Sequence, residues 1–202
     1  MQHLYENVLE PNILEQLQRT HSALIRKHGE TEDSRSTRIG VDYKILHKLL
    51  DPVVKSLIGE YEVHDSYFQR DRSPSAIHTD LFNTNDKQTH MSVLFPLGSD
   101  GPTSTVIFDE QSVDNITGRS NTGLKEFFED RPDSNYVYTE QERNLLAHCD
   151  PTILAKLSNP KFYKWTLGGA LVWPRIQIHA SDNIEHHATT YKDSLILFTT
   201  AP

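Results

Sequence analysis

The triplet His78-Thr79-Asp80 and the later segment Ile176-Gln177-Ile178-His179 carry the most information in this chain. Side chains two residues apart on an extended strand project from the same face, so His78 and Asp80 can reach one point together. His179 ends a second apolar, alternating segment and supplies another imidazole. Two histidines and one carboxylate form the ligand set that holds non-haem Fe(II) with coordination positions left open. The sequence therefore predicts a metal site at His78, Asp80 and His179.

A His-x-Asp triplet alone is a weak signal, because this chain has 11 histidines and 28 acidic residues and a solvated strand end can show one by chance. His186 and His187 are rival third ligands, since they lie only a few residues beyond His179. We favour His179 because an apolar alternating segment leads into it, whereas His186 and His187 stand in polar sequence.

The composition describes one domain without the marks of a nucleic-acid or membrane protein. The 202 residues suffice for one core, and the formal charge is −8 with no basic stripe, which makes a phosphate-backbone footprint unlikely. Cys149 is the single cysteine, so no internal disulfide can form. The N-terminus does not resemble a signal peptide and no apolar run approaches a membrane span. These features favour a cytoplasmic protein.

Residues 1–59 read as helical support. Apolar residues recur at helical spacing from Pro11 to a stop at Gly29, and again from Ile45, with Pro52 either breaking the second helix or beginning a new turn before Gly59. The polar segment 30–37 between them predicts a loop.

From residue 60 the period changes to two, which predicts strands in 60–111 and 167–202. The expected strands cover 61–69, 76–82, 90–97, 103–108, 170–173, 176–179 and 195–199. Residues 112–166 break this rhythm, with helices expected at 140–148 and 151–157. We interpret that region as an insertion that can serve as a lid. The pattern predicts a mainly β fold with N-terminal helices, in which the short strands form a sandwich or a barrel.

The order of these pieces resembles the Fe(II)/2-oxoglutarate-dependent oxygenases, and most closely their prolyl-4-hydroxylase-like branch. The resemblance spans Leu9 to Thr199 and rests on four motifs. These are His78-Thr79-Asp80, the segment Gly169-Ala170-Leu171-Val172-Trp173-Pro174, the segment His179-Ala180-Ser181, and the segment from Lys192 to Phe198. One departure is the interval from His179 to Lys192, which is somewhat longer than the family commonly shows.

The resemblance implies that the strands form a double-stranded β-helix, the cupin-like jelly roll, supported by the N-terminal helices. It also implies the roles of particular residues. His78, Asp80 and His179 would bind Fe(II), while Lys192 and Ser194 would bind the distal carboxylate of 2-oxoglutarate and Tyr67 would touch the same co-substrate. The reaction would consume O2, with ascorbate as reductant, and hydroxylate a peptidyl proline, an amino acid or a small molecule with release of succinate and CO2. Asp80 favours hydroxylation, demethylation or desaturation over halogenation, because halogenating relatives lack this carboxylate.

Two other classes of protein stay open at this point. One is a non-catalytic jelly-roll binding or structural protein, and the other is a cupin-like metalloenzyme that uses no 2-oxoglutarate. For three residues the sequence alone favours a role outside the functional site. Trp173 and Phe198 are expected to be packing residues, and Arg175 a surface residue. His90 is a candidate neighbour of the metal site and His148 a bystander. The sequence does not indicate the oligomeric state.

Overall fold

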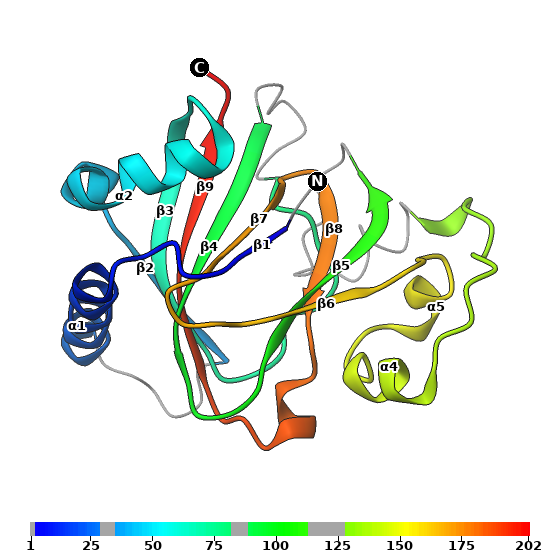
Figure 1. The fold of residues 1–202 in the computed structure, drawn as a ribbon. Helices are drawn as coiled ribbons and strands as arrows, with labels where there is room; N and C mark the ends of the chain where they lie inside the picture. The colour runs from blue at the N-terminus through cyan, green and yellow to red at the C-terminus, as the bar shows by residue number, and fades with distance from the viewer. Residues whose placement is uncertain (1–2, 29–34, 82–88, 113–127) are drawn as a thin grey trace.

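The computed structural model describes residues 3–28, 35–81, 89–112 and 128–202. Two antiparallel sheets face one another, with helices on the outer side of each (Figure 1). The chain is mainly β with N-terminal helices, as predicted, and its two facing sheets do not close into a continuous barrel within these residues. The predicted jelly-roll class is therefore confirmed.

The larger sheet has the strand order β1-β7-β4-β9-β3-β2, and the smaller one the order β6-β5-β8. Every pairing is antiparallel. The strands are β1 (Leu4–Tyr5), β2 (Ser36–Gly40), β3 (Glu62–Asp71), β4 (Thr89–Ser99), β5 (Ser104–Gln111), β6 (Lys161–Lys164), β7 (Ala170–Pro174), β8 (Gln177–Ser181) and β9 (Lys192–Thr200).

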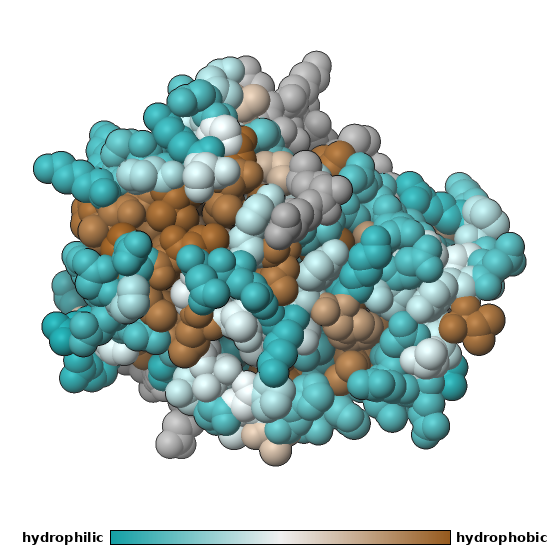
Figure 2. Space-filling view, in the orientation of Figure 1, coloured by the Kyte–Doolittle hydropathy of each residue, from teal (hydrophilic) through white to brown (hydrophobic). Residues whose placement is uncertain are grey.

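Helices α1 (Pro11–His28) and α2 (Tyr43–Ile58) cover the outer face of the larger sheet (Figure 1). Leu17, Leu50 and Val54 of these helices bury against Phe68 and Val93 of the sheet. Partly buried apolar side chains surround this core, and Figure 2 shows apolar surface between the two helices. The helices form because apolar residues recur on one face of each.

Alternation along the strands separates the outer face from the inner one. On β9, Leu195 and Leu197 join the core under the helices, whereas Ile196 and Phe198 face inward with Tyr67 and other residues of a separate apolar cluster. The same period places polar side chains on the inner face at one end of the sheet. The space between the two sheets is therefore lined by both apolar and polar side chains, because every second residue of each strand faces inward.

The smaller sheet is covered on its outer side by α4 (Glu140–Leu145) and α5 (Pro151–Leu154) (Figure 1). Leu146, Cys149 and Ile153 from this region pack against Val106 and Ile178 of the sheet. Both helices begin with a capping side chain, Thr139 for α4 and Asp150 for α5. The insertion predicted at 112–166 thus contains the two expected helices, and also strand β6, which the sequence did not suggest. Residues 113–127 lie outside the described residues, and a lid stays a prediction.

Two parts of the predicted secondary structure were wrong. No strand covers 76–81: only His78 forms an isolated bridge, to His179, while the amide of Asp80 bonds instead to the carbonyl of Arg175. The segment runs antiparallel to β8, but it bonds to β8 and the turn before it only at separated positions, so no continuous ladder forms. The predicted loop at 30–37 ends earlier than expected, because Ser36 and Thr37 already belong to β2, while 29–34 lie outside the described residues.

Pro52 neither breaks α2 nor begins a separate helix. The helix runs without interruption from Tyr43 to Ile58 with Pro52 inside it, and Gly59, with φ of 78°, ends it. A positive φ at this position suits glycine because it has no Cβ. Among the helices of the described ranges, none is both long and apolar enough to cross a membrane.

We expect Leu50→Ala to destabilise the protein by about 2–5 kcal/mol, because a fully buried leucine leaves a cavity that its neighbours fill only partly. Ile45→Ala on the same helix is the matched control, since Ile45 is 71% exposed and its loss should change stability by less than about 0.5 kcal/mol. Urea unfolding followed by circular dichroism measures both. Equal effects of the two substitutions would contradict the packing described for α2.

Candidate metal centre

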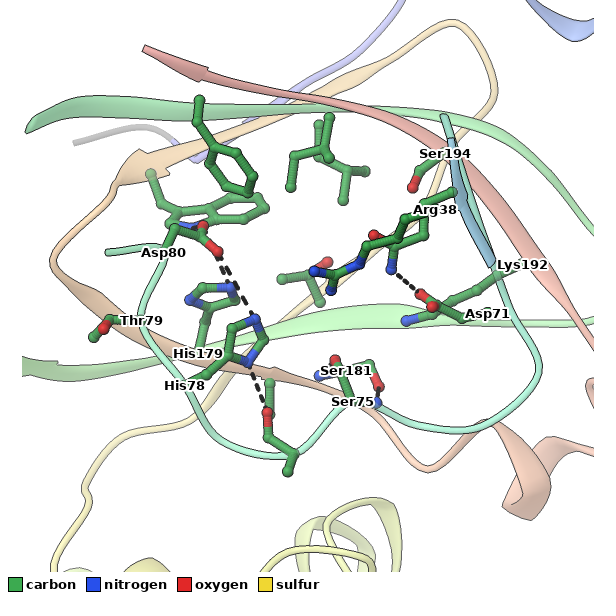
Figure 3. A pocket seen from close by; sticks show the side chains of 18 of the residues that line it. Arg38, Asp71, Ser75, His78, Thr79, Asp80, His179, Ser181, Lys192 and Ser194 are labelled. Carbon is green, nitrogen blue, oxygen red and sulfur yellow. Dashed lines mark hydrogen bonds and ion pairs between the residues drawn. The ribbon is translucent and has the colours of Figure 1, made fainter. Parts of the chain in front are cut away.

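His78, Asp80 and His179 meet between the two sheets (Figure 3). One donor atom from each lies within 4.8 Å of the others. The Nε2 atoms of His78 and His179 are 3.8 and 3.5 Å from the carboxylate of Asp80, and the two imidazole centres are 4.2 Å apart. Neighbouring ligands of one transition-metal ion lie about 3 Å apart, since each bond is about 2.1 Å long. A small closing motion would therefore let all three bind one ion.

Backbone carbonyls determine which nitrogen of each imidazole is available. The Nδ1 atom of His78 lies 2.7 Å from the carbonyl of Ala76, and that of His179 lies 3.0 Å from the carbonyl of Gln177. A carbonyl only accepts hydrogen bonds, so Nδ1 must carry the proton in both rings. The Nε2 lone pairs are then directed at the meeting point, which is the arrangement that metal-binding histidines use.

Asp80 is held by two donors from the larger sheet. Its Oδ2 atom accepts hydrogen bonds from the hydroxyl of Ser92, at 2.6 Å, and from the indole of Trp173, at 2.8 Å. Arg175, which is fully buried, donates to the backbone carbonyl of Asp80 at 3.1 Å. These contacts orient the carboxylate and leave Oδ1 on the side of His78. Sequence analysis missed all three donors, and Arg175, which it placed on the surface, is buried.

The electrostatics of the cluster suit a cation. Burial raises the pKa of Asp80, but the neighbouring His179 and His78 and the two donated hydrogen bonds outweigh burial and hold the pKa below its ordinary value. Burial and the proximity of His179 lower the pKa of His78 to about 4. Near neutral pH the cluster is thus one carboxylate with a neutral His78, and a metal ligand needs these protonation states. The residues present fit a divalent transition metal.

A cavity of about 380 Å³ opens beside the three residues. Its walls combine apolar side chains of the larger sheet, among them Leu94, Trp173, Ile196 and Phe198, with polar ones at the opposite end. Tyr67, Lys192 and Ser194, the three residues predicted to touch a co-substrate, all line it. The fold therefore gathers every predicted site residue around one space.

Lys192 is a cationic residue at the far end of this cavity (Figure 3). It is only 3% exposed, and its ammonium lies 4.9 Å from the centre of the Trp165 ring. Burial lowers its pKa, while Asp71 and Asp182 oppose that shift. No carboxylate of the described ranges lies within ion-pair distance of the ammonium. Asp71 lies opposite Lys192 in the register of β3 and β9 and accepts a hydrogen bond from Gln69. Sequence analysis did not predict its presence here.

Ser194 and Tyr67 share the inner face of the sheet with Lys192. Ser194 follows Lys192 by two residues on β9, so alternation directs both side chains into the cavity. The ring of Tyr67 packs edge-on against Phe198 with centres 5.3 Å apart. Burial raises the pKa of the Tyr67 hydroxyl, which keeps it protonated.

The remaining candidate histidines lie elsewhere. His186 is exposed, and Nε2 of His187 faces Asp182 at 3.8 Å, so neither joins the cluster. His90 contacts the carbonyl of Ile58 at the end of α2, and His148 contacts that of Ser75. Neither of these two residues lines the main cavity.

Comparison with solved structures relates this fold to one class of enzymes. The epimerase SnoN, solved with Fe3+, alpha ketoglutarate and nogalamycin RO, matches with a TM-score of 0.63 and 10% identity over 98% of this chain and 77% of SnoN. HygX from Streptomyces hygroscopicus, solved with nickel and 2-oxoglutarate, matches with a TM-score of 0.56 and 12% identity over 98% of this chain and 81% of HygX. EctD from S. alaskensis, solved with 2-oxoglutarate and 5-hydroxyectoine, matches with a TM-score of 0.58 and 14% identity over 98% of this chain and 71% of EctD.

These structural neighbours are Fe(II)/2-oxoglutarate oxygenases and related epimerases, and at such low identity the likeness shows a shared jelly-roll fold. No protein-family model matches the sequence, and no curated protein matches it either. The prolyl-4-hydroxylase-like branch stays a prediction.

We expect Trp173→Phe to weaken binding of Mn(II) about tenfold to hundredfold, because outer hydrogen bonds to a metal ligand commonly contribute this much. Trp165→Phe is the matched control, since that indole donates to Thr105 and not to Asp80. Anaerobic calorimetry measures the affinity, and thermal unfolding of the metal-free variants confirms that both are folded. Equal Mn(II) affinities in the two variants would show that the indole does not support a metal ligand.

Proposed function

We propose that this protein is an Fe(II)- and 2-oxoglutarate-dependent oxygenase, with His78, Asp80 and His179 as the iron ligands. The observation that carries the proposal is the convergence of two Nε2 lone pairs and one carboxylate on a single point beside a cavity. Each ligand is oriented by its own hydrogen bonds, which a chance cluster would not require. His78 donates to the carbonyl of Ala76 and His179 to that of Gln177. Asp80 accepts from Ser92 and Trp173. The fold shared with known oxygenases of this class supports the same conclusion.

Lys192 and Ser194 would hold the distal carboxylate of 2-oxoglutarate. A buried ammonium beside a hydroxyl offers charge-assisted hydrogen bonds to an oxyanion, and both side chains line the cavity opposite the metal cluster. Asp71, next to Lys192, would keep the ammonium oriented and partly offset its charge. The keto acid end of the co-substrate would then lie toward His78, Asp80 and His179.

Iron with 2-oxoglutarate and O2 supplies an oxidant for C–H bonds, with release of succinate and CO2. The residues of the chain would bind and orient the metal ion and the co-substrate, and they would exclude water from the site. Trp173, Phe198, Ile196 and Leu94 form an apolar wall that would limit water near the reacting carbon. The Nδ1–H groups that donate to backbone carbonyls leave Nε2 of each imidazole directed at the metal position, and the hydrogen bonds to Asp80 would prevent its carboxylate from rotating away from an ion bound there.

The finer reaction we propose is hydroxylation, with ascorbate maintaining the iron in its reduced state. The substrate would be a small molecule, an amino acid or a peptidyl proline, as in the prolyl-4-hydroxylase-like branch, and the protein would act in the cytoplasm.

The test is turnover of 2-oxoglutarate. We expect the protein with Fe(II), ascorbate and O2 to release succinate, measured by mass spectrometry, even without substrate, and Asp80→Ala to abolish it. His186→Ala is the matched control, because His186 is exposed and outside the cluster, and it should retain wild-type rates.

Lys192→Ala should raise the apparent KM for 2-oxoglutarate about tenfold to hundredfold, since a hydrogen bond to a charged group contributes roughly 1.5–3 kcal/mol. Metal binding without any effect of 2-oxoglutarate on thermal stability would favour a cupin-like metalloenzyme instead. Neither metal nor 2-oxoglutarate binding would favour a non-catalytic jelly-roll protein, because a ligand of the native state must stabilise it.

A further inference from the structure

Arg38 is a charged residue of the cavity that sequence analysis did not single out. It comes from β2, the edge strand of the larger sheet, and lines the same space as the metal cluster and Lys192. Figure 3 shows its side chain reaching into the pocket between the Lys192 end and the cluster of His78 and Asp80. It lies close enough for its charge to contribute to the lowered pKa of His78.

Strand register and an aromatic ring hold Arg38 in this position. Arg38 pairs with Gln69 on β3, and Gln69 pairs in turn with Ser194 on β9, so all three side chains belong to one inward-facing row. The guanidinium carbon lies 5.5 Å from the centre of the Tyr67 ring. A cation in contact with an aromatic ring gains about 0.5–1 kcal/mol even at exposed sites, which favours the inward conformation.

The donors of this guanidinium remain available to a ligand. No carboxylate of the described residues lies within ion-pair distance of Arg38, and its guanidinium packs against the Tyr67 ring. A guanidinium presents five N–H groups in a planar fork that matches the two oxygens of a carboxylate or phosphate. Arg38 is therefore a charged binding group without a counter-ion in the part of the chain that the structure describes.

Arg38 and Lys192 differ in burial, and this difference separates their roles. Lys192 is enclosed at 3% exposure, which suits a co-substrate that is surrounded by protein. Arg38 is exposed although it lines the cavity, so it stands where the cavity meets solvent. A molecule that enters after 2-oxoglutarate can therefore contact Arg38 from the solvent side of the cavity.

We propose that Arg38 binds a carboxylate or phosphate group of the molecule to be oxidised, so that the substrate is a small organic anion with an apolar body. This inference rests on the proposed function. The apolar body would pack against Leu94, Ile196 and Phe198, which line the same cavity. Arg38 is thus a specificity-determining residue distinct from the residues proposed for iron and 2-oxoglutarate.

The experiment uses protein loaded with Mn(II), which does not turn over, and saturated with 2-oxoglutarate. The probes are benzoate against benzamide and phenyl phosphate against phenol, with affinities measured by calorimetry. We expect each anion to bind about tenfold to hundredfold more tightly than its neutral partner, and this preference to disappear in Arg38→Gln. Arg38→Lys should retain only part of the preference, because an ammonium lacks the planar fork.

Arg35→Gln is the matched control, since Arg35 is exposed just before β2 and does not line the cavity, and it should keep the preference for anions. A wild-type protein without that preference, or an Arg38→Gln variant that retains it, would overturn the inference. Weaker 2-oxoglutarate binding in Arg38→Gln with unchanged benzoate and phenyl phosphate binding would assign Arg38 to the co-substrate and overturn it as well. Failure to bind Mn(II) and 2-oxoglutarate would instead overturn the proposed function together with this inference.

Discussion

Two backbone hydrogen bonds between His78 and His179 hold the candidate metal centre together. The amide of each residue donates to the carbonyl of the other, at 2.9 and 3.0 Å, and so joins the segment after β3 to strand β8. Bonds between Ser75 and Ser181 and from Asp80 to Arg175 fasten the same segment on either side. Because these are main-chain bonds, they fix the positions of the two Cα atoms relative to each other. The imidazole rings therefore have little freedom to separate.

The carboxylate of Asp80 connects this arrangement to the larger sheet. Its two donors, Ser92 on β4 and Trp173 on β7, come from strands that pair directly with each other. A buried carboxylate is stable only when its hydrogen-bonding capacity is met, so the donors and the acceptor require one another. The buried guanidinium of Arg175, bonded to the carbonyls of Asp80 and Thr199, extends the network to β9. The site is thus part of the packing between the sheets.

The cavity has two chemically different ends, and strand alternation produces both. Toward the metal cluster the inner face of β9 carries Ile196 and Phe198, whereas toward the beginning of the same strand it carries Lys192 and Ser194. One strand therefore provides an apolar wall for a carbon centre and a cationic end for an anion. Arg38, on the edge strand, extends this polar end toward solvent. The cavity is therefore lined by two cationic side chains that differ in depth, Lys192 being enclosed and Arg38 exposed.

Much of this could be predicted from the sequence because the signals are local. Helical and strand periods identified α1, α2 and most strands, and spacing by two residues identified His78 with Asp80 and Lys192 with Ser194. These signals depend on geometry within one element, which a linear pattern records. The predicted strand at 76–82 was wrong over its described part, 76–81. Alternation is present there, but a strand also needs a continuous ladder of backbone bonds to a neighbour, and the pattern contains no information about neighbours.

The tertiary structure alone decided which residues surround Asp80 and which face the cavity opening. Trp173, Ser92 and Arg38 matter because β7 lies beside β4 and β2 beside β3, and such pairings join residues far apart in the sequence. Residue type does not reveal them, since tryptophan and serine are ordinary on a buried strand and arginine on an edge strand. The linear order of residues specifies the chemistry that is available, whereas long-range strand pairing specifies which groups come within hydrogen-bonding distance.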